Sequence, residues 1–436
     1  MPAERNSLAA NLRGLQGYAA DALPVAVARE ALRRLIRPIA DCESIALAAA
    51  SGRVLAGELT APANVPGYDN AAMDGFAVRA LDLRDDATTE LAYVGTVLAG
   101  QRAASPLLLP GECVRIMTGA ALPPGADTVV MQEHAEVVGA RGDKEARVRI
   151  PARQKTGQHV RRAGEDIRAG QVLLAAGHRL RPADLGLIAS LGLGTLEVRR
   201  RLRVAFFSTG DEVASIGEPL GPGHIYDSNR YTLHAMLLRL GFEAIDLGVV
   251  RDDPAALERA LLEAAARADA IVTSGGVSGG DADYVRGLAQ KLGEVLFWKL
   301  AMRPGRPLAF GRIGRAWLFA LPGNPVATMV AFCVLVREAL LRIAGCGTEH
   351  DQPALNVRCT TPLRKVRGRT EYQRGILLRE ASGDWCVRST GDQGSGILRS
   401  MSLANCLIVL DEVRGDVAAG ESVPVQPFAR SVTVSV

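Results

Sequence analysis

The middle of the chain alternates between short apolar runs and longer segments in which apolar residues recur every three to four positions. Residues 201–208 and 270–276 have the apolar character of buried strands, whereas residues 228–241 and 253–269 have the spacing of amphipathic helices. Because strands and helices keep alternating over residues 201–345, we expect an open, mostly parallel sheet covered by helices on both faces.

Residues that favour helix starts precede several of the predicted helices. Ser228, Asp253 and Asn324 stand in N-cap positions, and Pro254 and Pro325 occupy first helical positions, where a missing N–H is harmless. These polar residues therefore have a structural explanation available beside any functional one.

The flanking regions show other patterns. Residues 22–39 predict one helix that ends near Pro38, and residues 60–160 consist of short β-like runs separated by Pro and Gly turns. After residue 350 helical periodicity disappears, and the remaining runs predict a small β barrel or sandwich. We therefore expect a central α/β unit flanked by β modules.

Length and charge limit the class of protein. A chain of 436 residues exceeds what one hydrophobic core usually supports, and 48% hydrophobic with 22% charged residues is ordinary for a globular protein. A net charge of +4 is too weak to indicate nucleic-acid binding. The basic clusters at 199–203 and 364–369 are each either a phosphate-binding patch or a solvated surface, and the solvated surface is favoured.

Cysteine usage and the N-terminus point to a reducing compartment. The 7 cysteines are scattered and include no C-x-x-C pair, which argues against a disulfide framework and against structural zinc. The N-terminus lacks the features of a signal peptide, and no stretch is apolar enough to span a bilayer. We expect a cytoplasmic protein without a membrane or nucleic-acid partner.

Four loops follow predicted strands of the central sheet, at residues 208–213, 249–254, 272–285 and 321–325. Open α/β sheets bind ligands at the carboxyl ends of their strands, so these loops should share one cleft. No P-loop motif occurs and no G-x-G-x-x-G follows a predicted strand, which disfavours a P-loop NTPase or a dinucleotide dehydrogenase. The 6 histidines lack metal-ligand spacing, and no G-x-S-x-G elbow marks a serine nucleophile.

The loop VTSGGVSGGDADYV, residues 272–285, combines bare backbone with hydroxyls and two carboxylates. Unhindered N–H groups suit a phosphate or pyrophosphate, but carboxylates beside a phosphate repel it unless a cation lies between them. Mg²⁺ typically takes one or two carboxylates plus phosphate oxygens, so a magnesium-bridged phosphate is favoured over a helix cap or a merely tight turn. The residues concerned are Thr273, Ser274, Gly275, Gly276, Ser278, Gly279, Gly280, Asp281 and Asp283.

Two other loops leave structural and functional explanations open. Asp253 is explained as a helix cap, whereas Asp252 and Glu212 lack that explanation and are candidate ligands. Residues 321–325 are equally well explained as a good helix start and as an anion site at the N-terminus of that helix.

A proline-braced turn at residues 302–310 carries Arg303 and Arg306, with Lys299 just before it. Cations on a stiff loop suit oxyanions. Taken alone, however, the turn is better explained as solvated surface.

An ordered series of motifs extends over nearly the whole chain. They are PGYDNAAMDGFAV (66–78), RIMTGA (115–120), VRRAGEDI (160–167), FSTGDEV (207–213), YDSN (226–229), VVRDDP (249–254), TSGGVSGGDADYV (273–285), FWKLAMRPGRPLAFG (297–311), LPGNPVA (321–327) and GDQGSGILRSMSLANC (391–406). Taken together, they resemble the molybdopterin molybdenumtransferase family, whose members insert molybdate into adenylylated molybdopterin during molybdenum-cofactor synthesis.

The resemblance implies an elongated homodimer whose subunits have four parts. These are a split N-terminal linker region (1–60 and 165–200), an inserted small β domain (61–164), a three-layer α/β molybdopterin-binding domain (201–349) and a C-terminal β barrel (350–436). The resemblance also implies that the active site lies where the α/β and barrel parts of one subunit face the inserted domain of the other. The inserted domain would contribute Asp69, Asp74, Thr118, Arg161 and Asp166.

The resemblance also implies roles for individual residues. The catalytic set would be Asp69, Asp74, Thr118, Asp166, Glu212, Asp252 and Asp283, and Mg²⁺ would be held by Glu212, Asp252 and Asp283. The pterin nucleotide would contact Arg161, Ser208, Thr209, Gly210, Ser274, Gly275, Gly276, Ser278, Pro322 and Pro325, and molybdate would be received by Lys299, Arg303, Arg306, Arg374 and Ser395. We expect water to attack the pyrophosphate, AMP to leave and the dithiolene to bind molybdenum.

Five positions depart from the pattern of the family. Gly279 replaces a bulkier residue, arginines replace the usual lysines at 303 and 306, Ala327 replaces a serine and Asp392 a histidine. Because Arg and Lys bind oxyanions differently, we expect these changes to affect the affinity for molybdate, or the preference for molybdate over tungstate, more than the class of reaction.

The resemblance implies further partners and leaves two alternatives. The partners are a molybdopterin adenylyltransferase and molybdoenzyme chaperones, in transient contact. The alternatives are an adenylyltransferase acting one step earlier and a non-catalytic molybdopterin-binding scaffold. The extra β modules argue against the adenylyltransferase, and the retained aspartates argue against the scaffold.

Overall fold

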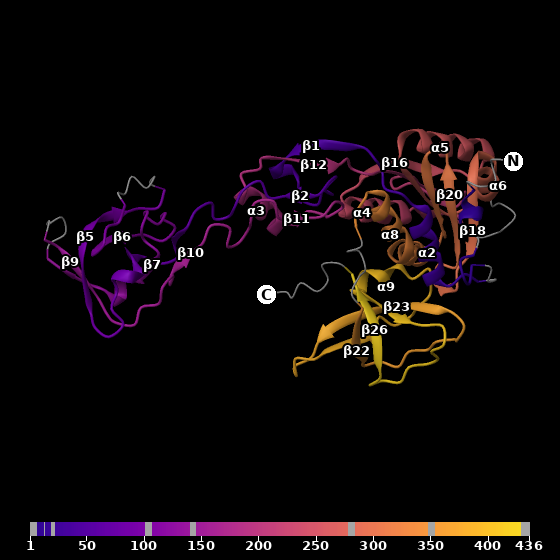
Figure 1. Cartoon of the computed structure of the whole chain (residues 1–436). Coiled ribbons are helices and arrows are strands. Elements are labelled where there is room, and N and C mark those ends of the chain that lie inside the picture. Colours follow the sequence, from indigo (N-terminus) through magenta and orange to yellow (C-terminus); the bar gives the residue numbers. More distant parts are fainter. Residues whose placement is uncertain are drawn as a thin grey trace.

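The protein is elongated, with a small β domain at one end of an arm and the α/β and barrel parts together at the other end (Figure 1). The computed structural model describes residues 7–12, 14–18, 22–100, 107–139, 145–277, 284–347 and 354–428. The four expected parts are present, which confirms the fold class. The residue numbers at which one part passes into the next stay a prediction.

A six-stranded sheet in the order β16-β13-β17-β21-β20-β18 forms the centre of the α/β part. Its strands are β13 (Arg203–Thr209), β16 (Glu243–Val250), β17 (Ala270–Ser274), β18 (Gly293–Lys299), β20 (Pro307–Ile313) and β21 (Ala316–Leu321). The first four strands in the sheet order run parallel, and β20 is antiparallel to both of its neighbours. The predicted open, mostly parallel sheet is confirmed.

Helices cover both faces of this sheet, which explains why its strands are continuous apolar runs. The helices are α4 (Asn229–Leu240), α5 (Pro254–Arg267), α6 (Tyr284–Leu292) and α7 (Pro325–Ala331), the last continuing through a π-helical turn (Phe332–Val336) into α8 (Arg337–Ile343). Helices α4, α7 and α8 pack on one face, and α5 and α6 pack on the other.

The predicted helix caps are confirmed in part. Asp253 caps α5, because its Oδ2 accepts the N–H of Ala256 at 2.8 Å. The side chain of Ser228 makes no cap bond, and the N–H of Arg230 is instead donated to Asp227 Oδ1 at 3.0 Å. Asn324 likewise precedes α7 without a side-chain cap bond. A buried carboxylate upstream has therefore taken the role predicted for Ser228.

The linker region is assembled from two distant stretches of chain. β1 (Cys42–Ala46) pairs with β12 (Thr195–Arg199), β2 (Leu59–Thr60) pairs with β11 (Val172–Leu174), and α3 (Pro182–Ser190) packs beside them. Its own small core includes Leu55, Leu180, Ile188, Leu196 and Val198.

The N-terminal segment packs on the α/β part rather than on the linker. It contains α1 (Leu8–Asn11) and α2 (Val25–Leu35), so the helix predicted over 22–39 is confirmed but is shorter. α2 buries Val25, Ala28, Ala31 and Leu32 in the main core, a spacing that follows the helical repeat.

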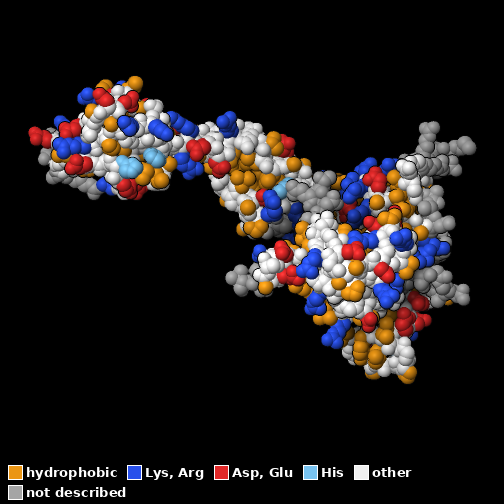
Figure 2. All heavy atoms as spheres, turned by 90° about the horizontal axis from the view of Figure 1, so that it is seen from below, with side chains coloured by type: hydrophobic (Ala, Val, Ile, Leu, Met, Phe, Trp, Pro, Cys, Tyr) orange, Lys and Arg blue, Asp and Glu red, His pale blue; other side chains and the backbone are white. Residues whose placement is uncertain are grey.

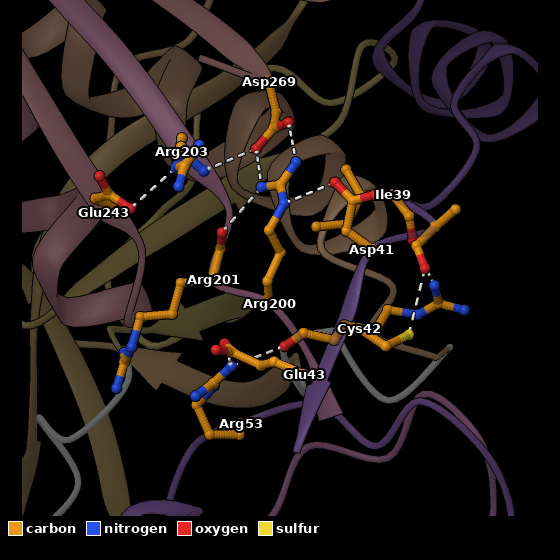
Figure 3. A network of polar contacts seen from close by, with 12 residues as sticks. Ile39, Asp41, Cys42, Glu43, Arg53, Arg200, Arg201, Arg203, Glu243 and Asp269 are labelled. Atoms are coloured by element: carbon orange, nitrogen blue, oxygen red, sulfur yellow. Dashed lines mark hydrogen bonds and ion pairs between the residues drawn. The ribbon is translucent and has the colours of Figure 1, made fainter. Parts of the chain in front are cut away.

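The arginines at 199–203 join the linker to the α/β sheet (Figure 3). Arg200 contacts Asp269 at 2.7 and 2.8 Å and Asp41 at 2.8 Å, which raises the pKa of its guanidinium. Arg203 contacts Glu243 at 3.2 Å. The cluster is therefore an intramolecular junction, and neither a phosphate site nor a simple solvated surface describes it.

The inserted domain is a six-stranded sheet in the order β7-β4-β6-β5-β9-β8. Its strands are β4 (Gly75–Val78), β5 (Thr89–Val97), β6 (Glu112–Ile116), β7 (Thr128–Met131), β8 (Glu136–Val138) and β9 (Arg147–Ile150). It packs around two small apolar clusters of its own, so the β region predicted over 60–160 is confirmed.

The C-terminal part is a closed five-stranded barrel, since β23 pairs with both β24 and β25. The strands are β22 (Leu355–Cys359), β23 (Thr370–Arg379), β24 (Trp385–Ser389), β25 (Cys406–Leu410) and β26 (Ser422–Pro427). The short helix α9 (Leu398–Leu403) was not predicted. β19 (Met302–Arg303) pairs with β23 and thereby joins the basic turn of the α/β part to the barrel.

Candidate functional site

The four loops singled out in the sequence meet at one edge of the α/β sheet. Ser274 lies opposite both Ser208 and Leu321 in the parallel register, and Thr209 lies opposite Val250. Lys299 at the end of β18 is opposite Pro307, which brings the basic turn to the same edge. The predicted shared cleft edge is confirmed for the described residues.

Asn229 ties two of these loops together. Its Nδ2 donates to Ser274 Oγ at 2.7 Å and to the carbonyl of Gly323 at 2.6 Å. Ser274 Oγ in turn donates to the carbonyl of Pro322 at 3.3 Å. Asn229 belongs to the YDSN motif, from which no role could be predicted for it, because only the fold shows which loops it joins.

Two of the hydroxyls at this edge bond to carboxylates of the protein, whereas the buried Oγ1 of Thr273 has no hydrogen-bond partner among the described residues. Ser208 Oγ donates to Asp227 Oδ1 at 2.9 Å, and Thr209 Oγ1 donates to Asp252 Oδ1 at 2.5 Å. Ser208 and Thr209 are also buried. Their hydroxyls thus hold the loops in place, and any contact of these residues with a substrate stays a prediction.

Gly275 and Gly276 have a packing reason to be glycine. Both have positive φ, at 101° and 69°. A Cβ on Gly275 would lie 2.4 Å from the carbonyl oxygen of Thr209, and one on Gly276 would lie 2.4 Å from Val285 Cγ2. The tight-turn explanation is therefore sufficient for these two glycines. The N–H of Gly275 is already donated to the carbonyl of Leu321, at 3.0 Å, so it is not free for a phosphate.

Two of the three predicted metal ligands lie on neighbouring strand ends. Asp252 is half-buried after β16, and the carboxylate of Glu212 lies 2.8 to 2.9 Å from the position of a Cβ on Gly210. Asp211 Oδ1 accepts the N–H of Asp252 at 3.2 Å. Within the described ranges no group of three or more His, Cys, Asp or Glu side chains is arranged to hold a metal ion.

The rest of the glycine loop, residues 278–283, lies outside the described residues. Ser278, Asp281 and Asp283 were predicted as part of the site, and Gly279 was noted as a departure from the family pattern. All four positions belong to that segment, so their roles stay predictions.

The N-terminus of α7 is already used within the protein. The N–H of Val326 donates to the carbonyl of Ser395 at 3.1 Å, and the N–H of Thr328 donates to the carbonyl of Asn324 at 2.9 Å. These contacts favour the structural explanation of residues 321–325 over an anion site at the helix start. They also dock a barrel loop on the α/β part and place Ser395 beside it.

Two adjoining pockets lie between the α/β part and the barrel, and Arg303, Pro304 and Gln393 line both. The first has a volume of about 260 Å³ and is lined by Arg303, Pro304, Gly305, Pro307, Pro322, Gly323, Asn324, Ala327, Gln393 and Ser395. The second has about 390 Å³ and is lined by Arg303, Pro304, Pro362, Leu363, Arg364, Glu371, Tyr372, Gln373, Arg374, Ser389, Gly391, Asp392, Gln393 and Gly394. The turn predicted to suit oxyanions thus lines a pocket and is not a plain surface turn.

Arg374 is a buried cation without a carboxylate partner among the described residues. It is 1% exposed, and its guanidinium donates to Ser400 Oγ at 3.0 Å and to the carbonyls of Gly394 and Asp392 at 3.1 and 3.4 Å. Burial and the nearby charge of Arg303 lower its pKa to about 10, so it remains charged at neutral pH. A buried charge with only neutral partners is costly to retain in a fold.

Glu371 is a buried carboxylate in the same pocket. Its side chain is 7% exposed and lies 3.7 Å from Arg303, and its Oε2 accepts from Gln373 Nε2 at 3.1 Å. Neither Glu371 nor Gln393 was singled out in the sequence, because no local motif reveals that a strand of the barrel faces the basic turn.

The residues predicted in the inserted domain gather at the far end of the arm. Thr118 donates from its N–H and its Oγ1 to Asp74 Oδ1, both at 2.7 Å, which lowers the pKa of Asp74. The N–H of Ala163 and the guanidinium of Arg162 contact Asp69, each at 2.7 Å, and lower its pKa. Both carboxylates are therefore held ionised.

Two predictions in this group stay open. Arg162 is the arginine that contacts Asp69, while its neighbour Arg161 lies 3.9 Å from Glu165, and the predicted contact of Arg161 with the substrate stays a prediction. Asp166 is exposed on the same segment. The inserted domain lies far from the α/β sheet of its own chain (Figure 1), so one subunit does not bring this group to the glycine loop.

Charges of both signs are interspersed over the face of the molecule shown in Figure 2. Among the helices of the described part of the chain, none combines the length and the apolar character needed to cross a membrane.

Comparisons with known proteins match most of the chain. Residues 23–192 match the MoeA N-terminal region (domain I and II), residues 205–342 a probable molybdopterin binding domain, and residues 356–428 the MoeA C-terminal region (domain IV). A molybdopterin molybdenumtransferase of Haemophilus influenzae is 40% identical over 387 residues, covering 88% of this chain and 94% of that protein. One of Nostoc is 36% identical over 390 residues, covering 88% of each. A solved molybdopterin biosynthesis protein of Pyrococcus horikoshii superposes with a TM-score of 0.80 at 27% identity, covering 93% of this chain and 100% of that chain.

Proposed function

This chain belongs to the molybdopterin molybdenumtransferase family, and we propose that it binds molybdate against Arg374 and releases AMP from adenylylated molybdopterin with the help of Mg²⁺. It is an enzyme of molybdenum-cofactor biosynthesis that inserts molybdenum. The observation that carries the proposal is the buried guanidinium of Arg374, which lines a pocket and has no carboxylate partner among the described residues.

A tetrahedral dianion suits this pocket for electrostatic reasons. The carbonyls and the hydroxyl around Arg374 hold its guanidinium without cancelling its charge, so the charge remains available to a ligand. Arg303 lines the same pocket, and its positive charge repels the positive charge of Arg374. An oxyanion between the two arginines would offset both the free-energy cost of burying Arg374 and this repulsion. Lys299, just before the turn, and Arg306, within it, line neither pocket but would add positive charge nearby.

We propose that the pterin nucleotide lies along the edge of the sheet. The ends of β13, β17 and β21 meet there, and Asn229 fixes the loops that follow β17 and β21. The pyrophosphate would lie against the backbone at Gly210, Gly275 and Gly276, next to Pro322. This position puts the nucleotide beside the pocket that contains Arg303 and Ser395.

Asp252 and Glu212 fit a magnesium ion that also contacts phosphate oxygens. They follow adjacent strands, Glu212 is exposed, and the second carboxylate oxygen of Asp252 has no hydrogen-bond partner among the described residues. Two carboxylates plus phosphate oxygens are a usual set for Mg²⁺, and Asp283 would join them. When bound, Mg²⁺ would stabilise the negative charge of the pyrophosphate.

The protein's own residues would then govern hydrolysis. Thr209 orients the carboxylate of Asp252, and the loops joined by Asn229 hold the nucleotide. Water attacks a phosphorus of the pyrophosphate, the bridging P–O bond breaks, and AMP leaves. The two dithiolene thiols would then displace an oxygen atom of the molybdate that Arg374, Arg303 and Ser395 hold, and this oxygen would leave as water with the two thiol protons.

A homodimer would complete the site. The carboxylates of Asp69 and Asp74 are held ionised at the far end of the arm from their own sheet edge. Placing them over the partner's pocket would give them a function that the single subunit does not provide. We also propose that the protein works in the cytoplasm, in transient contact with the adenylyltransferase that supplies its substrate and with molybdoenzyme chaperones.

The proposal is tested by an assay of product formation. Purified protein would be mixed with adenylylated molybdopterin, molybdate and Mg²⁺, and the product used to activate a cofactor-free molybdoenzyme. The wild type should activate it and Arg374→Met should not, because methionine fills similar space without the charge. Equal activation by both proteins would contradict the assignment of Arg374.

A further inference from the structure

We propose that Gln393 is the positioning residue of the oxyanion site, fixing the loop that holds the guanidinium of Arg374. The inference rests on the proposed function, because it concerns how the same chain holds molybdate. Gln393 lines both pockets and was given no role by the sequence motifs.

The side-chain amide of Gln393 contacts the main chain of Arg374 just beyond the end of β24. β24 ends at Ser389, which is opposite Gly375, and the next residue, Thr390, donates its N–H to the carbonyl of Arg374 at 3.1 Å. The N–H of Arg374 donates to Gln393 Oε1 at 2.7 Å, and Gln393 Nε2 lies 3.3 Å from the carbonyl oxygen of Arg374. The amide thereby contacts both main-chain groups of a residue that lines the second pocket.

The orientation of this amide is fixed by its partners. Because the backbone N–H of Arg374 can only donate, the atom of Gln393 that faces it must be the oxygen. Nε2 then lies 3.0 Å from the carbonyl of Gly391 and 3.1 and 3.3 Å from the hydroxyl oxygens of Ser389 and Thr390. The two N–H groups of Nε2 share these acceptors, so the side chain of Gln393 holds together the loop of residues 389–393.

The same loop supplies the partners of the buried guanidinium. The carbonyls on either side of Gln393, those of Asp392 and Gly394, both accept from Arg374 Nη2. Two residues along, the carbonyl of Ser395 accepts the N–H of Val326 at the start of α7. One glutamine thus docks a loop that holds Arg374 and joins the barrel to the α/β part beside the oxyanion pocket.

Carbonyl partners also explain why a glutamine suits this position. A carbonyl holds a guanidinium without neutralising it, whereas a carboxylate beside it would compete with the ligand for the charge.

Gln393→Met removes the hydrogen bonds and keeps the length of the side chain. Gln393→Glu keeps an acceptor for the N–H of Arg374 but removes the donor and adds a charge. Gln426→Met is the control, since Gln426 is half-buried on the same barrel and lines neither pocket.

The test measures two KM values for each protein, one for molybdate and one for adenylylated molybdopterin. Gln393→Met and Gln393→Glu should each raise the molybdate KM at least about tenfold, because the loop would no longer hold the hydrogen bonds to the charged guanidinium of Arg374 in place. The nucleotide KM should change less than about twofold, a split that general loss of folding would not produce. Gln426→Met should resemble the wild type.

Calorimetric titration of molybdate alone separates this inference from the proposed function. If the wild type does not turn over but binds molybdate, and both Gln393 variants bind it at least about tenfold more weakly, the inference stands and the proposed function fails. Folded Gln393 variants with an unchanged molybdate KM and affinity would overturn the inference alone. A wild type that neither turns over nor binds molybdate would overturn both. Should Gln393→Met fail to fold, Gln393→Glu decides the same question.

Discussion

The carboxylate of Glu371 lies 3.7 Å from the guanidinium of Arg303 in the pocket that Arg374 also lines. Glu371 is nearly fully buried, and Arg303 is the one cation that contacts its carboxylate among the described residues. A dianion entering this pocket meets a negative charge that already engages one of its two arginines. We therefore expect Glu371 to limit the affinity of this pocket for oxyanions.

Removing this charge should strengthen oxyanion binding. Gln at position 371 keeps the shape and the hydrogen bond to Gln373, and we expect Glu371→Gln to lower the KM for molybdate by roughly tenfold, since a nearby like charge shifts such equilibria by about one unit or more. Glu371→Asp keeps the charge and serves as the control. Partial unfolding cannot increase the affinity, so a lower KM would report the loss of the charge. An unchanged or higher KM for molybdate in Glu371→Gln would refute this role of Glu371.

Two adjacent aspartates should have separable roles. Asp252→Ala should lower magnesium-dependent AMP release by roughly a hundredfold, as expected when a carboxylate near a metal is lost. Asp253→Ala should leave AMP release unchanged and lower the free energy of unfolding by about 1 kcal/mol, because it removes only the cap of α5. The measurement is AMP release against Mg²⁺ concentration, with urea unfolding alongside. Equal loss of activity in both variants would argue for a structural role of Asp252.

Mixed dimers test whether the site is built across two subunits. Asp74→Ala removes a group at the end of the arm, and Arg374→Met removes one in the barrel pocket, so each variant alone should be inactive. In a mixed dimer one of the two sites keeps both residues. Random association of equal amounts should therefore restore about a quarter of the wild-type activity. No recovery in demonstrably mixed dimers would mean that the two residues do not serve one site in trans.

The linker should carry a pH-dependent stability. Burial alone would raise the pKa of Asp184, but hydrogen bonds from Arg181 and His178 outweigh it and lower the pKa to about 2. Since the folded pKa lies below the unfolded value of about 3.9, the stabilisation is complete above about pH 4 and is lost as the pH falls towards 2. Asp184→Asn should unfold at a lower temperature than the wild type at pH 7, and this gap should close towards pH 2.5. A gap that stays constant would contradict the linkage.

The sequence predicted the elements of the α/β part because its periodicity reports burial directly. Continuous apolar runs such as β13 and β17 can only be covered on both faces, and parallel strands then bring their following loops to one edge. Asp253 was predictable as a cap because both the cap and the proline after it are local signals. Ser228 was assigned wrongly because the competing carboxylate of Asp227 is just as local, and only burial favours it.

The oxyanion pocket could not be predicted in the same way. Arg374 and Glu371 lie on β23, and they face Arg303 only because β19 pairs with β23 across the border of two domains. Such a contact depends on tertiary packing, for which a single sequence holds no periodic signal. The resemblance supplied Arg374 and Ser395, but it gave no role to Gln393, which bonds to the main chain of Arg374, or to Asn229, which joins the loops that follow β17 and β21.

The most direct test of the account is AMP release from adenylylated molybdopterin by the purified protein in the presence of Mg²⁺, measured with and without molybdate. We predict that AMP release depends on molybdate in the wild type and that this dependence is lost in Arg374→Met. AMP release that is equally fast without molybdate, or no release despite tight nucleotide binding, would contradict it.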